Sequence, residues 1–149
     1  MTKAGHSAIF STTGNDDVHI ILRGGNGRPN YDAVSVEQVA EGLKKAQLRP
    51  NIMIDFSHDN SLKQCQRQLI VGDDVAGQIA TGDHRIMGVM IESHLKAGNQ
   101  SVIEGQELVY GQSITDGCLS WEDTAPLLRT LAQAVQKRRT IDSNRSLNV

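Results

Sequence analysis

The sequence is poor in aromatic residues and in cysteine. Only 3% of its 149 residues are Phe, Trp or Tyr, so a folded core must consist mainly of aliphatic side chains. The two cysteines, Cys65 and Cys118, are too few for a framework of disulfide bonds, which fits a protein of the reducing cytoplasm. The length is nevertheless sufficient for one domain with a hydrophobic core.

Long runs of one charge and long apolar runs are also missing. The formal net charge is −2, and no block of like charge suggests a surface for nucleic acid. No apolar run reaches the roughly 18 residues of a membrane-spanning helix. The first ten residues, MTKAGHSAIF, lack the features of a secretory signal. We therefore expect a cytoplasmic protein that binds neither nucleic acid nor membranes.

Three short, nearly continuous apolar runs are present, and each ends in polar residues. The runs are Val18–Gly25, Asn51–Asn60 and Ile86–Glu92. Such runs, bounded by turn residues, are typical of strands that are buried on both faces. Their polar side chains stand at the carboxyl ends, where parallel α/β folds build their sites.

Helical patterns follow each of these runs. Ser35 with Gln38, and Ser61 with Gln64, form capping boxes that predict the starts of two helices. A third helix is predicted over 124–139, starting late because Pro126 is tolerated only in a first turn. Its predicted inner face consists of Leu128, Leu131, Ala132 and Val135.

The order strand–helix, three times repeated, predicts an α/β fold with parallel strands. The chain could be a small open sheet or part of a (β/α)₈ barrel, and its length alone favours the open sheet because a full barrel needs roughly 200 residues or more. The long polar connection over 93–118 is expected to be functional or disordered.

One imidazole and two carboxylates could form a metal site. His58 and Glu92 follow two of the predicted strands, and Asp116 lies in the long connection. This donor set suits Mn, Fe, Co or Zn ions. Without the strand-end argument, a His58 bonded to a neighbouring loop and two solvated acids would be the simpler interpretation.

Other residues admit two roles each. Arg23, beside two glycines, could bind a phosphate group or form a structural ion pair. Asp55 could orient a ligand residue or join an ion pair inside a barrel, and we favour the ion pair. Cys65 is predicted to pack on its helix, and Cys118 to be a packed thiol rather than a further ligand.

Several strings resemble one enzyme family. GHSAI, HIILRGG, IDFSH, GVMIESHL, YGQSITDGC and SWEDT are similar to the carboxyl-terminal part of class I 3-deoxy-D-arabino-heptulosonate 7-phosphate synthases, also called phospho-2-dehydro-3-deoxyheptonate aldolases. The resemblance runs from about Gly5 to Arg139. It implies that residues 1–139 form the last three strand–helix units of a (β/α)₈ barrel and that 140–149 form a flexible tail.

The resemblance also implies a function. The family condenses phosphoenolpyruvate with erythrose 4-phosphate in the first step of aromatic amino-acid synthesis, uses a divalent metal and forms homo-oligomers. By motif, His58, Glu92 and Asp116 match its metal ligands, with His58 and Asp116 also catalytic, and Arg23 matches an arginine that holds the phosphate of phosphoenolpyruvate.

The resemblance leaves some of the family's site without a counterpart in this sequence. The family's fourth metal ligand is a cysteine from an earlier part of the barrel, and neither Cys65 nor Cys118 matches it. We therefore expect this chain to be inactive on its own. The alternatives are a non-catalytic remnant that at most binds metal or phosphate and, less favoured, an independent doubly wound phosphate-binding module.

Overall fold

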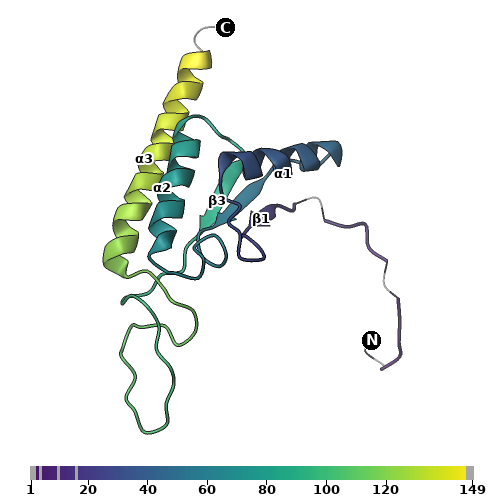
Figure 1. Ribbon diagram of the computed structural model, residues 1–149. Coiled ribbons are helices and arrows are strands. Elements are labelled where there is room, and N and C mark those ends of the chain that lie inside the picture. The colour runs from purple at the N-terminus through teal and green to yellow at the C-terminus, as the bar shows by residue number, and fades with distance from the viewer. Residues whose placement is uncertain (1–2, 4, 10, 16, 147–149) are drawn as a thin grey trace.

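The computed structural model describes residues 3, 5–9, 11–15 and 17–146 (Figure 1). Three parallel strands form a sheet in the order β1-β2-β3: Ile20–Leu22 (β1), Ile52–Asp55 (β2) and Ile86–Met90 (β3). Three helices alternate with them: Ala33–Lys45 (α1), Arg67–Ala80 (α2) and Trp121–Ser146 (α3). The predicted α/β fold with parallel strands is therefore confirmed.

The core lies between the sheet and the helices. Ile52 and Ile54 of the central strand are fully buried, and Phe56 follows them at 0% exposure. Each helix contributes the apolar positions that recur at helical spacing. These positions are Val36, Ala40 and Leu43 of α1, Val71, Val75, Ala76 and Ile79 of α2, and Leu127, Leu131 and Ala134 of α3.

Apolar side chains remain exposed on the sheet. Ile21 on β1 is 51% exposed and Met87 on β3 is 59% exposed. Within the described residues, β1 and β3 each pair with β2 alone, so both outer edges of the sheet are open. An open parallel sheet with an uncovered apolar face is the arrangement expected for part of a barrel.

The predicted starts of the first two helices are wrong. Asp32 rather than Ser35 caps α1, because its Oδ1 accepts hydrogen bonds from the backbone N–H groups of Val34 and Ser35, both at 3.0 Å. Ser61 does not begin α2 either. Its hydroxyl donates to the carbonyl of His58 at 3.1 Å, and this stabilises a turn that precedes the helix.

Helix α3 begins earlier than predicted, at Trp121. Ser120 caps it: the backbone N–H of Asp123 donates to Ser120 Oγ at 3.2 Å, and this hydroxyl donates to Asp123 Oδ2 at 3.0 Å. Pro126 therefore lies inside the helix.

The inner face of α3 also differs from the prediction. Leu131 is buried as expected, but Leu128 is 45% exposed and Ala132 is exposed, whereas Leu127 is only 4% exposed. The reason is the close approach of Leu127 to Gly72 of α2, which leaves room for it by having no side chain.

The predicted helix end at Arg139 is wrong as well, because α3 continues to Ser146. Two contacts explain this extension. Arg138 donates to the carbonyl of Asp83 at 2.8 Å, and His84 Nε2 lies 3.0 Å from Asp142 Oδ1. Flexibility of this end stays a prediction, and residues 147–149 lie outside the described residues. Within the described part of the chain, none of the helices combines the length and apolar character needed to cross a bilayer.

Two glycines of α2 provide a test of this packing. A side chain at Gly72 would meet Leu127 Cδ1 at 2.5 Å and Phe56 Cε2 at 3.0 Å, whereas Gly77 has open space around it. We expect Gly72→Val to lower the free energy of unfolding by about 1–3 kcal/mol through overpacking. Gly77→Ala, the control, should raise it by about 0.5–1 kcal/mol through helix propensity. Urea unfolding followed by circular dichroism measures both, and equal effects would contradict the packing described.

Candidate metal and phosphate site

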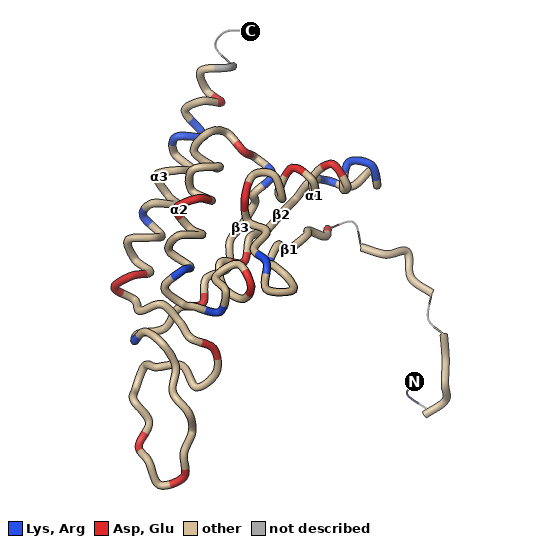
Figure 2. Tube along the Cα trace, in the orientation of Figure 1, with Lys and Arg blue, Asp and Glu red and all other residues tan. Residues whose placement is uncertain are grey.

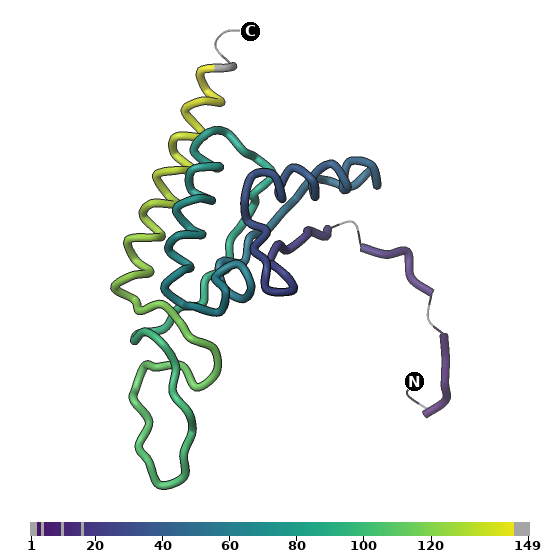
Figure 3. Tube along the Cα trace, viewed as in Figure 1, coloured from purple at the N-terminus to yellow at the C-terminus, as the bar shows by residue number. Residues whose placement is uncertain are grey.

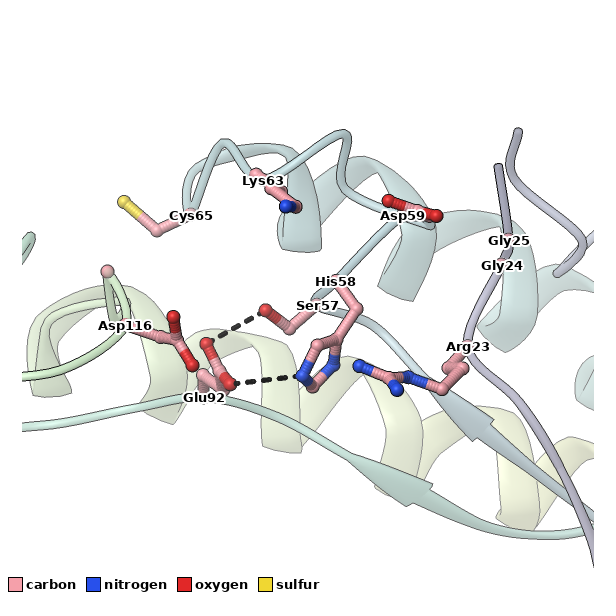
Figure 4. Close-up of a pocket in the computed structure, with 11 residues that line it drawn as sticks. Arg23, Gly24, Gly25, Ser57, His58, Asp59, Lys63, Cys65, Glu92 and Asp116 are labelled. Atoms are coloured by element: carbon pink, nitrogen blue, oxygen red, sulfur yellow. Dashed lines mark hydrogen bonds and ion pairs between the residues drawn. The ribbon is translucent and has the colours of Figure 1, made fainter. Parts of the chain in front are cut away.

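His58, Glu92 and Asp116 lie together at one end of the sheet (Figure 4). One ligand atom from each lies within 4.8 Å of the others. His58 comes shortly after the carboxyl end of β2, and Glu92 shortly after that of β3. The sequence-based expectation that these three side chains converge is therefore met by the geometry. Nitrogen and oxygen donors at this spacing can hold a divalent transition-metal ion.

Asp116 reaches this site because the connection over 93–118 is folded rather than disordered. The N–H of Leu119 donates to the carbonyl of Glu92 at 2.9 Å, and Gly98 and Cys118 exchange backbone hydrogen bonds at 2.8 and 3.1 Å. Figure 3 shows this segment running away from the sheet and returning beside its own start. We call this segment, residues 93–118, the arm. Its returning part carries Asp116 to the carboxylate of Glu92.

Asp55 orients the His58 ring. Its Oδ2 lies 2.7 Å from His58 Nδ1, and its Oδ1 accepts the N–H of Ser57 at 2.8 Å. Asp55 is 4% exposed, so this carboxylate is buried. A proton on Nδ1 that is donated to Asp55 leaves Nε2 free as a ligand atom. Nε2 is 3.9 Å from Glu92 Oε1. The contact between Asp55 and His58 matches the role in which Asp55 orients a ligand residue, and the favoured role in a barrel-interior ion pair stays a prediction.

Glu92 is fixed through both its side chain and its backbone. The Ser57 hydroxyl donates to Oε2 at 2.9 Å. Gln68 of α2, fully buried, accepts the N–H of Glu92 at 2.9 Å and donates to its carbonyl at 3.0 Å. Sequence reasoning missed Gln68. The available signal was a polar residue on the apolar face of α2, three positions before Val71.

A cavity of about 400 Å³ opens over the three candidate ligands. Arg23, Gly24 and Gly25 line it on the β1 side, and the phosphate-binding role of Arg23 stays a prediction. Gly24 has φ +75°, and a side chain there would lie 2.7 Å from Asp59 Cβ. This glycine is therefore needed for the close approach of the Arg23 loop to the His58 turn.

Figure 2 shows charged residues of both signs at this end of the sheet and others along the three helices. Lys63 and Asp59 line the cavity and were not singled out from the sequence. Cys65, expected to pack on a helix, also lines it. Cys118 is outside the candidate metal set. Burial raises the pKa of the Cys118 thiol, which disfavours the thiolate that a metal ligand requires.

The contact between Asp55 and His58 can be tested by replacing Asp55 with asparagine. The neutral amide no longer favours the Nδ1–H tautomer, so we expect Asp55→Asn to weaken Mn²⁺ binding roughly 10–100-fold. Asp73→Asn, an exposed change on α2, is the control and should leave the affinity unchanged. Electron paramagnetic resonance of free Mn²⁺ gives both affinities. Equal affinity of the two variants would contradict the orienting role.

Comparison with known proteins places this geometry in a family. A sequence model described as "DAHP synthetase I family" matches residues 1–129. The chain belongs to this family. The predicted resemblance is thereby confirmed.

Curated relatives in the DAHP synthetase I family share about half of the residues or more. The chain is 59% identical over 139 residues to "Phospho-2-dehydro-3-deoxyheptonate aldolase, Phe-sensitive" of Escherichia coli (strain K12). This match covers 93% of this chain and 39% of the relative. It is 53% identical over 144 residues to "Phospho-2-dehydro-3-deoxyheptonate aldolase" of Haemophilus influenzae, covering 97% of this chain and 40% of that one. The chain thus spans about two fifths of the length of these relatives.

A solved structure of the family has the same fold. The "Phospho-2-dehydro-3-deoxyheptonate aldolase from Francisella tularensis SCHU S4" superposes with a TM-score of 0.83 at 47% identity, over 92% of this chain and 40% of that chain. The open three-stranded sheet is therefore a partial barrel, as the resemblance implied, and not the small open sheet that length alone favoured.

Proposed function

We propose that this chain contributes the carboxyl-terminal half of the active site of a phospho-2-dehydro-3-deoxyheptonate aldolase. The overall reaction joins phosphoenolpyruvate and erythrose 4-phosphate, with addition of water, to give 3-deoxy-D-arabino-heptulosonate 7-phosphate and phosphate. The convergence of Arg23, His58, Glu92 and Asp116 on one cavity, in a chain of this family, is the observation that carries the proposal.

The candidate ligands suit a divalent ion such as Mn, Fe, Co or Zn. His58 would bind it through Nε2, and Glu92 and Asp116 through carboxylate oxygens. When bound, such an ion supplies Lewis-acid polarisation of the aldehyde carbonyl of erythrose 4-phosphate. The buried Asp55 and the Ser57 hydroxyl hold the imidazole and one carboxylate in place, which supports the fit.

The other residues of the cavity bind and position substrate. Arg23 offers a planar guanidinium that matches the oxygens of a phosphate group, so we assign it to phosphoenolpyruvate. Gly24 and Gly25 allow the substrate close to the backbone on that wall. Asp116, the most exposed of the three ligands, lies where it can also accept hydrogen bonds from sugar hydroxyls.

A chimera tests this proposal. Residues 5–139 replace the matching segment of the E. coli Phe-sensitive relative, and condensation is followed by loss of phosphoenolpyruvate absorbance. We expect turnover from the chimera and none when it carries His58→Ala. A chimera that folds and binds Mn²⁺ but shows no turnover would contradict the proposal.

A second candidate function concerns the chain by itself: metal binding without catalysis. The uncovered apolar face at Ile21 and Met87 favours it, because a sheet with both edges open lacks the walls that would complete the cavity. We expect the monomeric chain with Mn²⁺ to bind the ion and to produce no condensation. Measurable turnover by a monomer would contradict this candidate.

A further inference from the structure

The turn that carries His58 also carries a lysine to the cavity. Lys63 lines the cavity together with Arg23. In Figure 4 the two cationic side chains lie on different sides of His58, with Lys63 on the turn after β2 and Arg23 at the end of β1. Two separate cationic groups therefore flank the candidate metal ligands.

The backbone ties the position of Lys63 to that of His58. The N–H of Lys63 donates to the carbonyl of His58 at 2.9 Å, and the Ser61 hydroxyl donates to the same carbonyl at 3.1 Å. His58, Leu62 and Lys63 have φ values of +46°, +52° and +59°. Left-handed conformations are costly for residues with side chains and are retained where surrounding contacts enforce them. The turn thus has a defined shape that fixes where the lysine side chain begins.

Both cationic groups are available to a ligand. Within the described part of the chain, neither Arg23 nor Lys63 forms an ion pair with a carboxylate. The carboxylates that line the cavity are engaged with other groups than these two cations. Asp59 accepts the N–H of Gly27 at 3.2 Å, and Glu92 and Asp116 belong to the candidate metal set. With a divalent ion on those two acids, positive charge in the cavity exceeds negative charge. Such a cavity attracts an anionic ligand.

We propose that Lys63 binds the carboxylate of a phosphorylated carboxylic acid whose phosphate is held by Arg23. This inference rests on the proposed function and assigns a residue to the second anionic end of its substrate. The assignment of ends follows from side-chain chemistry, since the arginine fork matches a phosphate and the lysine ammonium acts as a point charge. Lys63 is thus a substrate-binding residue of this site.

The test uses the full chain loaded with Mn²⁺. Affinities for phosphoenolpyruvate and for inorganic phosphate are measured by isothermal titration calorimetry for the wild type, Lys63→Met, Lys63→Arg and the control Lys45→Met on α1. We expect Lys63→Met to weaken phosphoenolpyruvate binding roughly tenfold, the loss of one charged hydrogen bond, and phosphate binding less than about twofold. Lys63→Arg should restore most of the affinity, and Lys45→Met should resemble the wild type.

Each other outcome overturns the inference. Equal losses for the two ligands would show that Lys63 does not distinguish the carboxylate, and unchanged affinities would show that it contacts neither. Absence of phosphoenolpyruvate binding to the wild-type chain would also overturn it. Mn²⁺ affinity is measured separately, so failure of the metal site contradicts the proposed function instead. If Mn²⁺ does not bind, the same variants are titrated with phosphoenolpyruvate and with phosphate in its absence, and the two affinities are compared as before.

Discussion

Replacing His58 with alanine is expected to lower the Mn²⁺ affinity of the chain by more than about 100-fold. Changes to residues that merely support a metal ligand commonly cost 10–100-fold, and this substitution removes the ligand itself. It also leaves the buried Asp55 carboxylate without its partner on the imidazole. Electron paramagnetic resonance of unbound Mn²⁺ during titration measures the affinity directly.

His19→Ala is the matched control for this experiment. His19 is exposed, lies before β1 and does not line the cavity. The control should bind Mn²⁺ as the wild type does. A change of less than tenfold for His58→Ala, or a similar loss in both variants, would show that the ion binds elsewhere.

Asn60→Ala is expected to cause the largest loss of stability, about 3–6 kcal/mol. Asn60 is 1% exposed, and its amide nitrogen donates to the carbonyls of Leu22 at 3.0 Å and Asp55 at 2.7 Å. Its Oδ1 accepts the N–H of Asn30 at 2.8 Å. Alanine removes one hydrogen bond from each of three backbone groups, and a group that is left buried without a partner costs about 1–3 kcal/mol.

Urea unfolding measures this effect. Asn99→Ala is the matched control, because Asn99 is exposed and makes one hydrogen bond to the carbonyl of Thr115. It should change the free energy of unfolding by less than about 1 kcal/mol. A similarly small change for Asn60→Ala would contradict its role as the link between the ends of β1 and β2.

The position of the site could be predicted from the sequence because it depends on local order along the chain. A polar residue that follows an apolar strand within about three residues is placed at the edge where parallel strands end. This rule applies to Arg23, His58 and Glu92. Asp116 does not follow a strand, and its approach depends on backbone bonds between residues about twenty apart, such as Gly98 and Cys118.

The supporting residues could not be predicted in the same way. Asp32 and Ser35 both suit a helix cap, and only the folded chain decides between them. The face of α3 depends on the contact between Leu127 and Gly72, which lie on different helices. Gln68 bonds to the backbone of Glu92 and Lys63 lines the cavity, and no spacing rule predicts either position. Such choices depend on tertiary contacts, which override local preference.

The arm that carries Asp116 has a thermodynamic consequence. Two of the three candidate ligands stand on turns next to the sheet, whereas the third stands on a long segment held by its own backbone and side-chain hydrogen bonds. An ion that needs all three binds only the closed arrangement, so part of its binding energy is spent on selecting that arrangement from opened ones. By linkage, a change that favours opened arrangements of this segment lowers the affinity for the ion. A bound ion in turn raises the stability of the closed arrangement.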